Sequence, residues 1–164
     1  MSSSIGVCFV CLGNICRSPT AEGVMLHLVH EVGLAERIRV DSSGTGAYHV
    51  GERADRRSRE EASRRGVNLE SVARQFAARD FDRFDYLVAM DRDNFRDMLR
   101  LCPSPAHRDK LSLLRSFEPG ATPGAQLDVP DPYYGGDDGF ARVYDIVLAG
   151  CRGLLEHIRR QHGL

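Results

Sequence analysis

Lysine is almost absent from this chain, in which Lys110 is the only lysine among 22 basic residues. The formal net charge is −1, so the chain lacks the basic excess of general nucleic-acid binders, and no nucleic-acid partner is predicted. Arginine suits bidentate recognition of phosphate, although a biased genome is the simpler explanation of such a ratio. A local positive pocket for a phosphorylated ligand is compatible with this overall charge.

Long apolar runs are also missing. None approaches the roughly 20 residues that a membrane-spanning helix needs, so no membrane partner is predicted. The first residues, Met-Ser-Ser-Ser-Ile, show no charged segment followed by an apolar stretch, and we expect no secretory signal. The five cysteines are odd in number and lack the spacing of a closed zinc site, so neither a disulfide framework nor a metal is expected. This cysteine usage favours a reducing, cytoplasmic location.

Short apolar segments alternate with amphipathic segments along the chain. The length of 164 residues fits a single domain over residues 1–164. Strands are expected at residues 5–10, 38–42, 84–90 and 110–114, and helices at 18–32, 56–65, 92–101 and from 139 almost to the end. Ser18 is expected to cap the first helix, with Pro19 at its first position, and residues 118–130 are expected to form a loop. This order predicts an α/β fold, with a four-stranded parallel twisted sheet flanked by helices on both faces.

Two cysteines stand six positions before an arginine, namely Cys11 before Arg17 and Cys102 before Arg108. Arginine is so common here that the spacing alone carries little weight, and the surrounding residues separate the two. The 102–108 segment contains two prolines, which lack backbone N–H donors. The 11–17 segment contains none, follows an apolar strand and leads into a helix, at the sheet end where α/β folds bind ligands.

The 11–17 loop suits a phosphate group. Its N–H groups can form an anion-binding nest, and the helix that follows adds its positive dipole end. Arg17 can hold two phosphate oxygens with its planar fork, and this field also favours the nucleophilic thiolate form of Cys11. The simpler alternative is that Cys11 is a small core residue at a strand end, like Cys8.

The segment Val10-Cys-Leu-Gly-Asn-Ile-Cys-Arg-Ser-Pro19 resembles the signature of the low-molecular-weight protein-tyrosine phosphatases. Asp131-Pro-Tyr-Tyr134 resembles the acid loop of that family. Further matches in order and approximate spacing are Asp41-Ser42, Val72-Ala-Arg-Gln75, Phe84-Asp-Tyr86 and Met90-Asp91. The resemblance spans nearly the whole chain and implies a phosphatase that acts on phosphotyrosine-containing proteins or peptides and on small aryl phosphates. It implies inorganic phosphate or similar oxyanions as product or inhibitor, and no cofactor.

The resemblance also implies a role for each site residue. Cys11 attacks phosphorus to form a cysteinyl-phosphate, and Asp131 acts as general acid and then as general base. The phosphate-binding loop comprises Leu12, Gly13, Asn14, Ile15, Cys16, Arg17 and Ser18, with Ser42 as support for Asn14. Ser18 assists departure of the Cys11 thiolate, while Tyr48 and Tyr133 wall the pocket. We further expect Cys16 to act as redox partner of Cys11, because an oxidised thiolate in a curled loop can be captured by a nearby thiol.

Several points stay open at the level of sequence. Asp-Pro is a frequent turn dipeptide, and Asp128, Asp137 and Asp138 compete with Asp131 for the role of acid. A histidine that in many relatives precedes the Val-Ala-Arg-Gln stretch is Ser71 here, so a smaller or water-filled network around Asn14 is expected.

Four other functions are each compatible with part of the sequence. Arsenate reductase of the thioredoxin-coupled type needs mid-chain cysteines, and none lies between Cys16 and Cys102. Protein-arginine phosphatases resembling this chain carry threonine at the position of Ile15. A non-catalytic phosphotyrosine-binding module needs neither Cys11 nor Asp131. A nucleotide-binding module would rest only on Gly44-x-Gly46, a weak signal.

Overall fold

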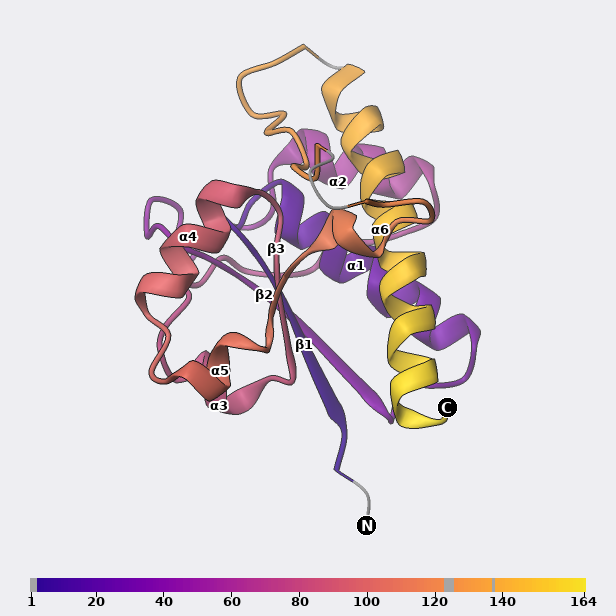
Figure 1. Ribbon diagram of the computed structural model, residues 1–164. Coiled ribbons are helices and arrows are strands. Elements are labelled where there is room, and N and C mark those ends of the chain that lie inside the picture. The colour runs from indigo at the N-terminus through magenta and orange to yellow at the C-terminus, as the bar shows by residue number, and fades with distance from the viewer. Residues whose placement is uncertain (1–2, 123–125, 137) are drawn as a thin grey trace.

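The computed structural model describes residues 3–122, 126–136 and 138–164, and its elements alternate between strand and helix (Figure 1). The strands are β1 (Ile5–Cys11), β2 (Ile38–Gly44), β3 (Tyr86–Ala89) and β4 (Leu111–Leu113). The longer helices are α1 (Arg17–Glu31), α2 (Arg56–Arg64), α4 (Arg92–Arg100) and α6 (Asp138–His162). These match the expected segments. The short helices α3 (Asp80–Arg83), α5 (Pro105–Arg108) and η1 (Leu114–Phe117) were not expected.

The four strands form one parallel sheet in the order β2-β1-β3-β4. Figure 1 shows α1 and α6 on one side of the sheet and α3, α4 and α5 on the other, and the strands turn relative to one another. The predicted fold class, a parallel twisted sheet with helices on both faces, is therefore confirmed. Among the described residues, no helix is both long and apolar enough to cross a membrane.

Strand β1 is buried along its whole length because both of its faces are covered. Val7, Phe9 and Cys11 belong to the core between the sheet and helices α1 and α6. Cys8 and Val10 point the other way, into the core that includes Met98 of α4. This alternation with period two is the geometry of any strand, and it explains why the sequence of β1 is apolar throughout rather than alternating.

The first helix begins differently from the expectation. Helix α1 starts at Arg17, after Cys16, and Ser18 is not its N-cap. The Ser18 hydroxyl is engaged elsewhere, 3.0 Å from Cys11 Sγ and 2.8 Å from the donating Asn14 Nδ2. Pro19 is tolerated because the first turn of a helix has no intrahelical partner for its missing N–H.

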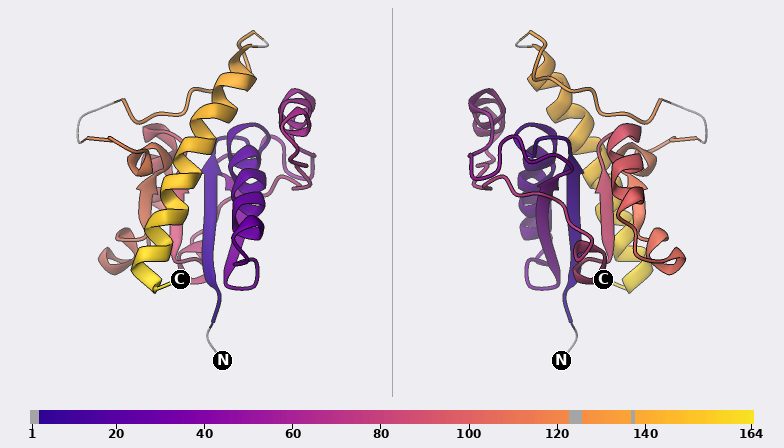
Figure 2. Two further views of the ribbon diagram at one scale, coloured as in Figure 1. Left: turned by 90° about the vertical axis from the view of Figure 1, so that its right-hand side faces the viewer. Right: turned by 90° about the vertical axis from the view of Figure 1, so that its left-hand side faces the viewer.

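The sheet brings several distant segments to one end of the molecule. Figure 2 shows the end of β1, the helix α2 and the start of α6 at this end, while the start of β1 and the end of α6 lie at the other. The expected loop over residues 118–130 contains no helix or strand in its described part, residues 118–122 and 126–130, and residues 123–125 lie outside the described residues.

Candidate active site

The Cys11–Ser18 loop connects β1 to α1 and packs closely against the end of β2. Asn14 is the only described residue other than glycine with a positive φ, 57°, a conformation that asparagine tolerates better than most residues. Thr45 N donates to the Cys11 carbonyl at 2.9 Å, and Gly46 N donates to the Leu12 carbonyl at 2.9 Å. A Cβ at Gly44 would stand 2.7 Å from the Leu12 carbonyl oxygen, so this close approach requires glycine.

The Cys11 sulfur lies at the centre of this loop. The Ser18 hydroxyl is 3.0 Å from it, and the backbone N–H of Asn14 donates to it at 3.3 Å. The residue is 3% exposed, yet its side chain lines a pocket that opens to solvent. The sulfur thus faces an N–H donor and a hydroxyl, beside the start of a helix.

The Asn14 side chain holds the loop from beneath. Its Nδ2 donates to the hydroxyl oxygens of Ser18 (2.8 Å) and Ser42 (2.9 Å), and its Oδ1 accepts from the backbone N–H of Arg74 (3.1 Å). Ser42 in turn donates to Glu22 Oε1 at 2.5 Å. Burial raises the pKa of the Glu22 carboxyl, although the Ser42 hydroxyl opposes the rise. Within the described chain, the hydrogen bonds of the Asn14 side chain go to these groups and not to Ser71.

Arg17 is almost fully buried and is anchored by three groups. Its Nη1 donates to Asp91 Oδ2 (2.5 Å) and to the Val129 carbonyl (3.0 Å), and its Nη2 is 3.6 Å from Asp131 Oδ2. Burial alone would lower the pKa of Arg17, but the negative charges of Cys11, Asp91 and Asp131 raise it above the usual value. The guanidinium is therefore charged, and Asp91 holds it in one orientation. The other carboxylate oxygen of Asp91 caps α4 by accepting from Asn94 N.

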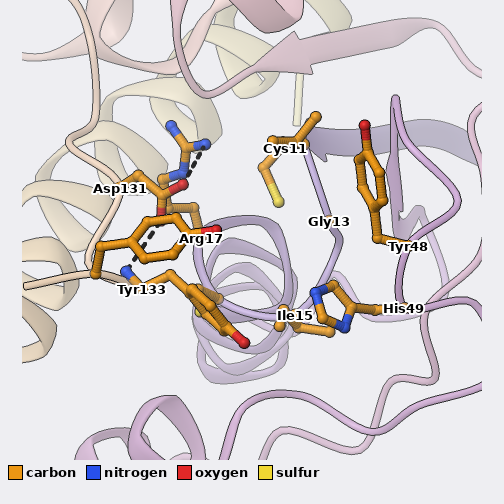
Figure 3. A pocket seen from close by; sticks show the side chains of 11 residues that line it. Cys11, Gly13, Ile15, Arg17, Tyr48, His49, Asp131 and Tyr133 are labelled. Carbon is orange, nitrogen blue, oxygen red and sulfur yellow. Dashed lines mark hydrogen bonds and ion pairs between the residues drawn. The ribbon is translucent and has the colours of Figure 1, made fainter.

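A pocket of about 450 Å³ surrounds these groups (Figure 3). Figure 3 shows the Cys11 sulfur between Asp131 and Tyr133 on one side and Tyr48 on the other. Asp131 Oδ1 accepts from the backbone N–H of Tyr133 at 3.0 Å, which fixes the carboxylate relative to its own loop. The lining residues are Cys11, Leu12, Gly13, Ile15, Cys16, Arg17, Tyr48, His49, Asp131, Tyr133 and Tyr134. All the residues expected to attack, clamp or protonate therefore face one space.

Cys16 lies in the same loop, and it both lines the pocket and packs into the interior of the protein. It is buried with Ile15, Ala73 and Phe140 in a small apolar cluster. Burial, helped by the negative charge of Asp55, raises the pKa of its thiol to about 12. Cys16 is therefore protonated at neutral pH in the resting protein.

The competing candidates lie elsewhere. Cys102 follows α4, and its thiol donates to the Ser104 carbonyl at 3.2 Å, away from the pocket-lining residues. Asp128 accepts from Arg92 N at 3.0 Å, and Asp138 begins α6 with an exposed side chain, so neither lines the pocket. Asp137 lies outside the described residues.

Four neighbours of the site were not expected in these positions. His49 and Tyr134 line the pocket, Asp91 anchors Arg17, and Glu22 accepts from Ser42. In the sequence, Asp91 stood out only within the Met90-Asp91 match, and in the structure it also caps α4. No sequence signal could have assigned the pairing with Arg17, because the two residues are 74 positions apart.

Comparison with known proteins places this arrangement in a family. A model described as "Low molecular weight phosphotyrosine protein phosphatase" matches residues 6–163. A low molecular weight protein-tyrosine-phosphatase of Streptomyces coelicolor is 47% identical over 94% of this chain and 94% of its own length. A crystal structure of a protein tyrosine phosphatase from Entamoeba histolytica, with Hepes in its active site, is 42% identical with a TM-score of 0.88 and covers 98% of this chain and 99% of its own.

One further solved structure, a Drosophila arginine phosphatase, has a TM-score of 0.84 and 32% identity, and covers 93% of this chain and 97% of its own. The same fold thus carries more than one named activity. The family match extends over nearly the whole chain, and the relatives are named as phosphatases. The chain therefore belongs to the low molecular weight phosphotyrosine protein phosphatase family, a family of hydrolases, which confirms both the resemblance seen in the sequence and the prediction that the protein is an enzyme.

Proposed function

We propose that this enzyme hydrolyses phosphotyrosine, and small aryl phosphates, through a cysteinyl-phosphate formed on Cys11. The observation that carries the proposal is the convergence of a sulfur, a buried guanidinium and a carboxylate on one pocket. Cys11, Arg17 and Asp131 all line it, and Arg17 Nη2 is 3.6 Å from Asp131 Oδ2. A nucleophile, a fixed positive charge and a proton donor are the groups that displacement at phosphorus requires.

In the first step, the Cys11 thiolate attacks phosphorus in line with the phenolic oxygen. An S–P bond forms, the P–O bond to the phenol breaks, and protonated Asp131 gives its proton to the departing oxygen. Arg17 and the N–H groups of residues 12–17 stabilise the negative charge on the three equatorial oxygens. Because Asp91 and Val129 hold Arg17 in place, little reorganisation is needed as the charge spreads.

In the second step, a water molecule attacks the cysteinyl-phosphate. The Asp131 carboxylate accepts a proton from this water, the S–P bond breaks, and inorganic phosphate is released. The Ser18 hydroxyl, 3.0 Å from Cys11 Sγ, donates to the departing thiolate. Asp131 has then regained its proton, and Cys11 is again a thiolate, so the cycle closes without a cofactor.

The pocket walls support an aromatic substrate. The Tyr48 and Tyr133 rings flank the space above Cys11 in Figure 3, and Ile15 adds an apolar surface. A phenyl ring between such walls gains apolar and aromatic contacts. A phosphoarginine guanidinium would place several N–H donors against Ile15, which offers no acceptor, so phosphotyrosine is the favoured substrate. We propose phosphotyrosine-containing proteins or peptides in the cytoplasm as partners.

The test compares turnover of phosphotyrosine, phosphoserine and phosphoarginine peptides, with arsenate reduction alongside. Phosphotyrosine is expected to be turned over fastest. Cys11→Ser should abolish turnover and retain binding of inorganic phosphate, while Cys102→Ser should remain active. Asp131→Ala should slow phosphotyrosine hydrolysis by about 10²- to 10⁴-fold, and Asp128→Ala should not. Faster turnover of phosphoarginine, or substantial activity in Cys11→Ser, would refute the proposal.

A further inference from the structure

Arg57 joins helix α2 to the loop of residues 131–136, here called the acid loop. Its Nη2 donates to the Tyr133 carbonyl at 3.2 Å. Its guanidinium carbon is also 5.4 Å from the centre of the Tyr133 ring and 4.6 Å from that of the Phe140 ring. Arg57 thus contacts both the backbone and the ring of Tyr133, and guanidinium groups favour such positions against aromatic rings.

The Tyr133 peptide units are fixed from both sides. The N–H of Tyr133 donates to Asp131 Oδ1 at 3.0 Å, and its carbonyl accepts from Arg57. A shift of Tyr133 would therefore move the Asp131 carboxyl group. The Asp131 side chain is 39% exposed, so burial contributes little to holding it in place.

On its other side, Arg57 is connected to the phosphate-binding loop through Asp55. The Arg57 guanidinium donates to both Asp55 carboxylate oxygens, at 3.1 Å each. The Asp55 backbone N–H donates to the Ile15 carbonyl at 2.8 Å. Asp55 also caps α2 by accepting from Arg57 N at 2.8 Å. A continuous set of polar contacts therefore runs from the loop that holds the nucleophile to the loop that holds the acid.

We propose that Arg57 is a positioning residue for the general acid, which holds the acid loop so that Asp131 reaches the leaving oxygen. The proposal rests on the proposed function, because it gives Asp131 the role of proton donor. Arg57 is not among the residues that line the pocket, and it acts through Tyr133. Misplacement of a catalytic group by about 1 Å can cost roughly 10²-fold in rate. The alternative is that Arg57 only stabilises α2.

The test uses kcat/KM for a series of aryl phosphates whose phenols differ in pKa. Arg57→Gln is expected to slow esters of weakly acidic phenols by about 10- to 100-fold and to leave esters of strongly acidic phenols within about threefold, because these need little protonation. Inhibition by inorganic phosphate should change little, since the Cys11–Ser18 loop is intact. The matched control is Arg56→Gln, which removes an adjacent arginine that is 74% exposed and pairs with Glu60, and which should leave the series unchanged.

A double variant separates positioning from simple stabilisation. If Arg57 acts through Asp131, then Arg57→Gln should slow the Asp131→Ala enzyme by less than about threefold, because the acid is already gone. Additive losses, or an equal loss across all esters in Arg57→Gln, would overturn the proposal while leaving the role of Asp131 intact. If instead the loss of activity in Asp131→Ala does not depend on the pKa of the leaving phenol, the proposed function and this inference are both overturned. Should Arg57→Gln fail to fold, Arg57→Lys, which keeps the charge but not the fork, should show the same dependence to a smaller degree.

Discussion

Replacement of Asn14 by alanine is expected to lower the free energy of unfolding by about 4 kcal/mol. The Asn14 side chain is 1% exposed and makes three hydrogen bonds, to Ser18, Ser42 and Arg74. A buried hydrogen bond contributes about 1 kcal/mol net, so the three account for about 3 kcal/mol. Alanine at a φ of 57° adds about 1 kcal/mol of backbone strain. This sum is a large part of the roughly 5–15 kcal/mol that stabilises an ordinary domain.

Asn14→Gly is the matched control, because glycine loses the same three bonds without the strain. It should be more stable than Asn14→Ala by about 1 kcal/mol. Urea unfolding followed by circular dichroism measures both differences, and with a slope near 2 kcal/mol/M the alanine variant should unfold at about 2 M less urea. If alanine were as stable as the parent, or more stable than glycine, then the network and the left-handed conformation at Asn14 would not hold this loop together.

Two further predictions concern other side chains of the site. After mild peroxide, Cys11 is expected to form a disulfide with Cys16 that thiols reverse, because both cysteines lie in one curled loop and line the same pocket, where the Cys16 thiol can capture the sulfenic acid of Cys11. Peptide mass mapping should find the bridge, and sulfinic acid on Cys11 with Cys16 free would contradict the prediction. Glu22→Gln should gain stability relative to the parent as pH rises above about 4.5. Burial raises the pKa of Glu22 in the folded state, so the unfolded chain releases this proton more readily and the parent loses stability. Thermal unfolding of both proteins at pH 4.5 and 7 measures the difference in stability, and a difference that is independent of pH would refute the prediction.

The main features of the fold could be predicted from local patterns. Apolar runs located the four strands, because a strand buried on both faces is apolar at successive positions. The spacing of apolar residues located the long helices, because a helix buried on one side is apolar every three to four residues. The cap of α1 was expected at Ser18 and lies at Cys16, two residues earlier, because Ser-Pro fits a capped helix start whether or not the serine hydroxyl is bonded elsewhere. The short helices α3, α5 and η1 contain too few residues for a helical spacing of apolar residues to be recognised.

The residues of the site also differ in how far the sequence alone could predict them. Cys11 to Ser18 form one continuous segment, so their grouping was available from the sequence. Asp131 could be chosen over Asp128 only through the resemblance to the family, because an Asp-Pro dipeptide by itself indicates a turn and not a catalytic role. The pairing of Arg17 with Asp91 and that of Arg57 with Tyr133 depend on tertiary contacts across 74 and 76 positions. Such contacts leave no local pattern to recognise.

The burial of β1 on both faces has a consequence for insertions and deletions. Cys11 faces the same core as Val7 and Phe9, whereas Cys8 and Val10 face the other. Loss or gain of one residue within β1 would exchange the two sets and turn the Cys11 sulfur to the wrong side of the sheet. A change of two residues would restore the side but displace the sulfur by about 7 Å along the strand. The side of the sheet that the Cys11 sulfur faces thus depends on whether the number of residues in β1 changes by an odd or an even number. The length of this strand is therefore constrained by catalysis as well as by packing.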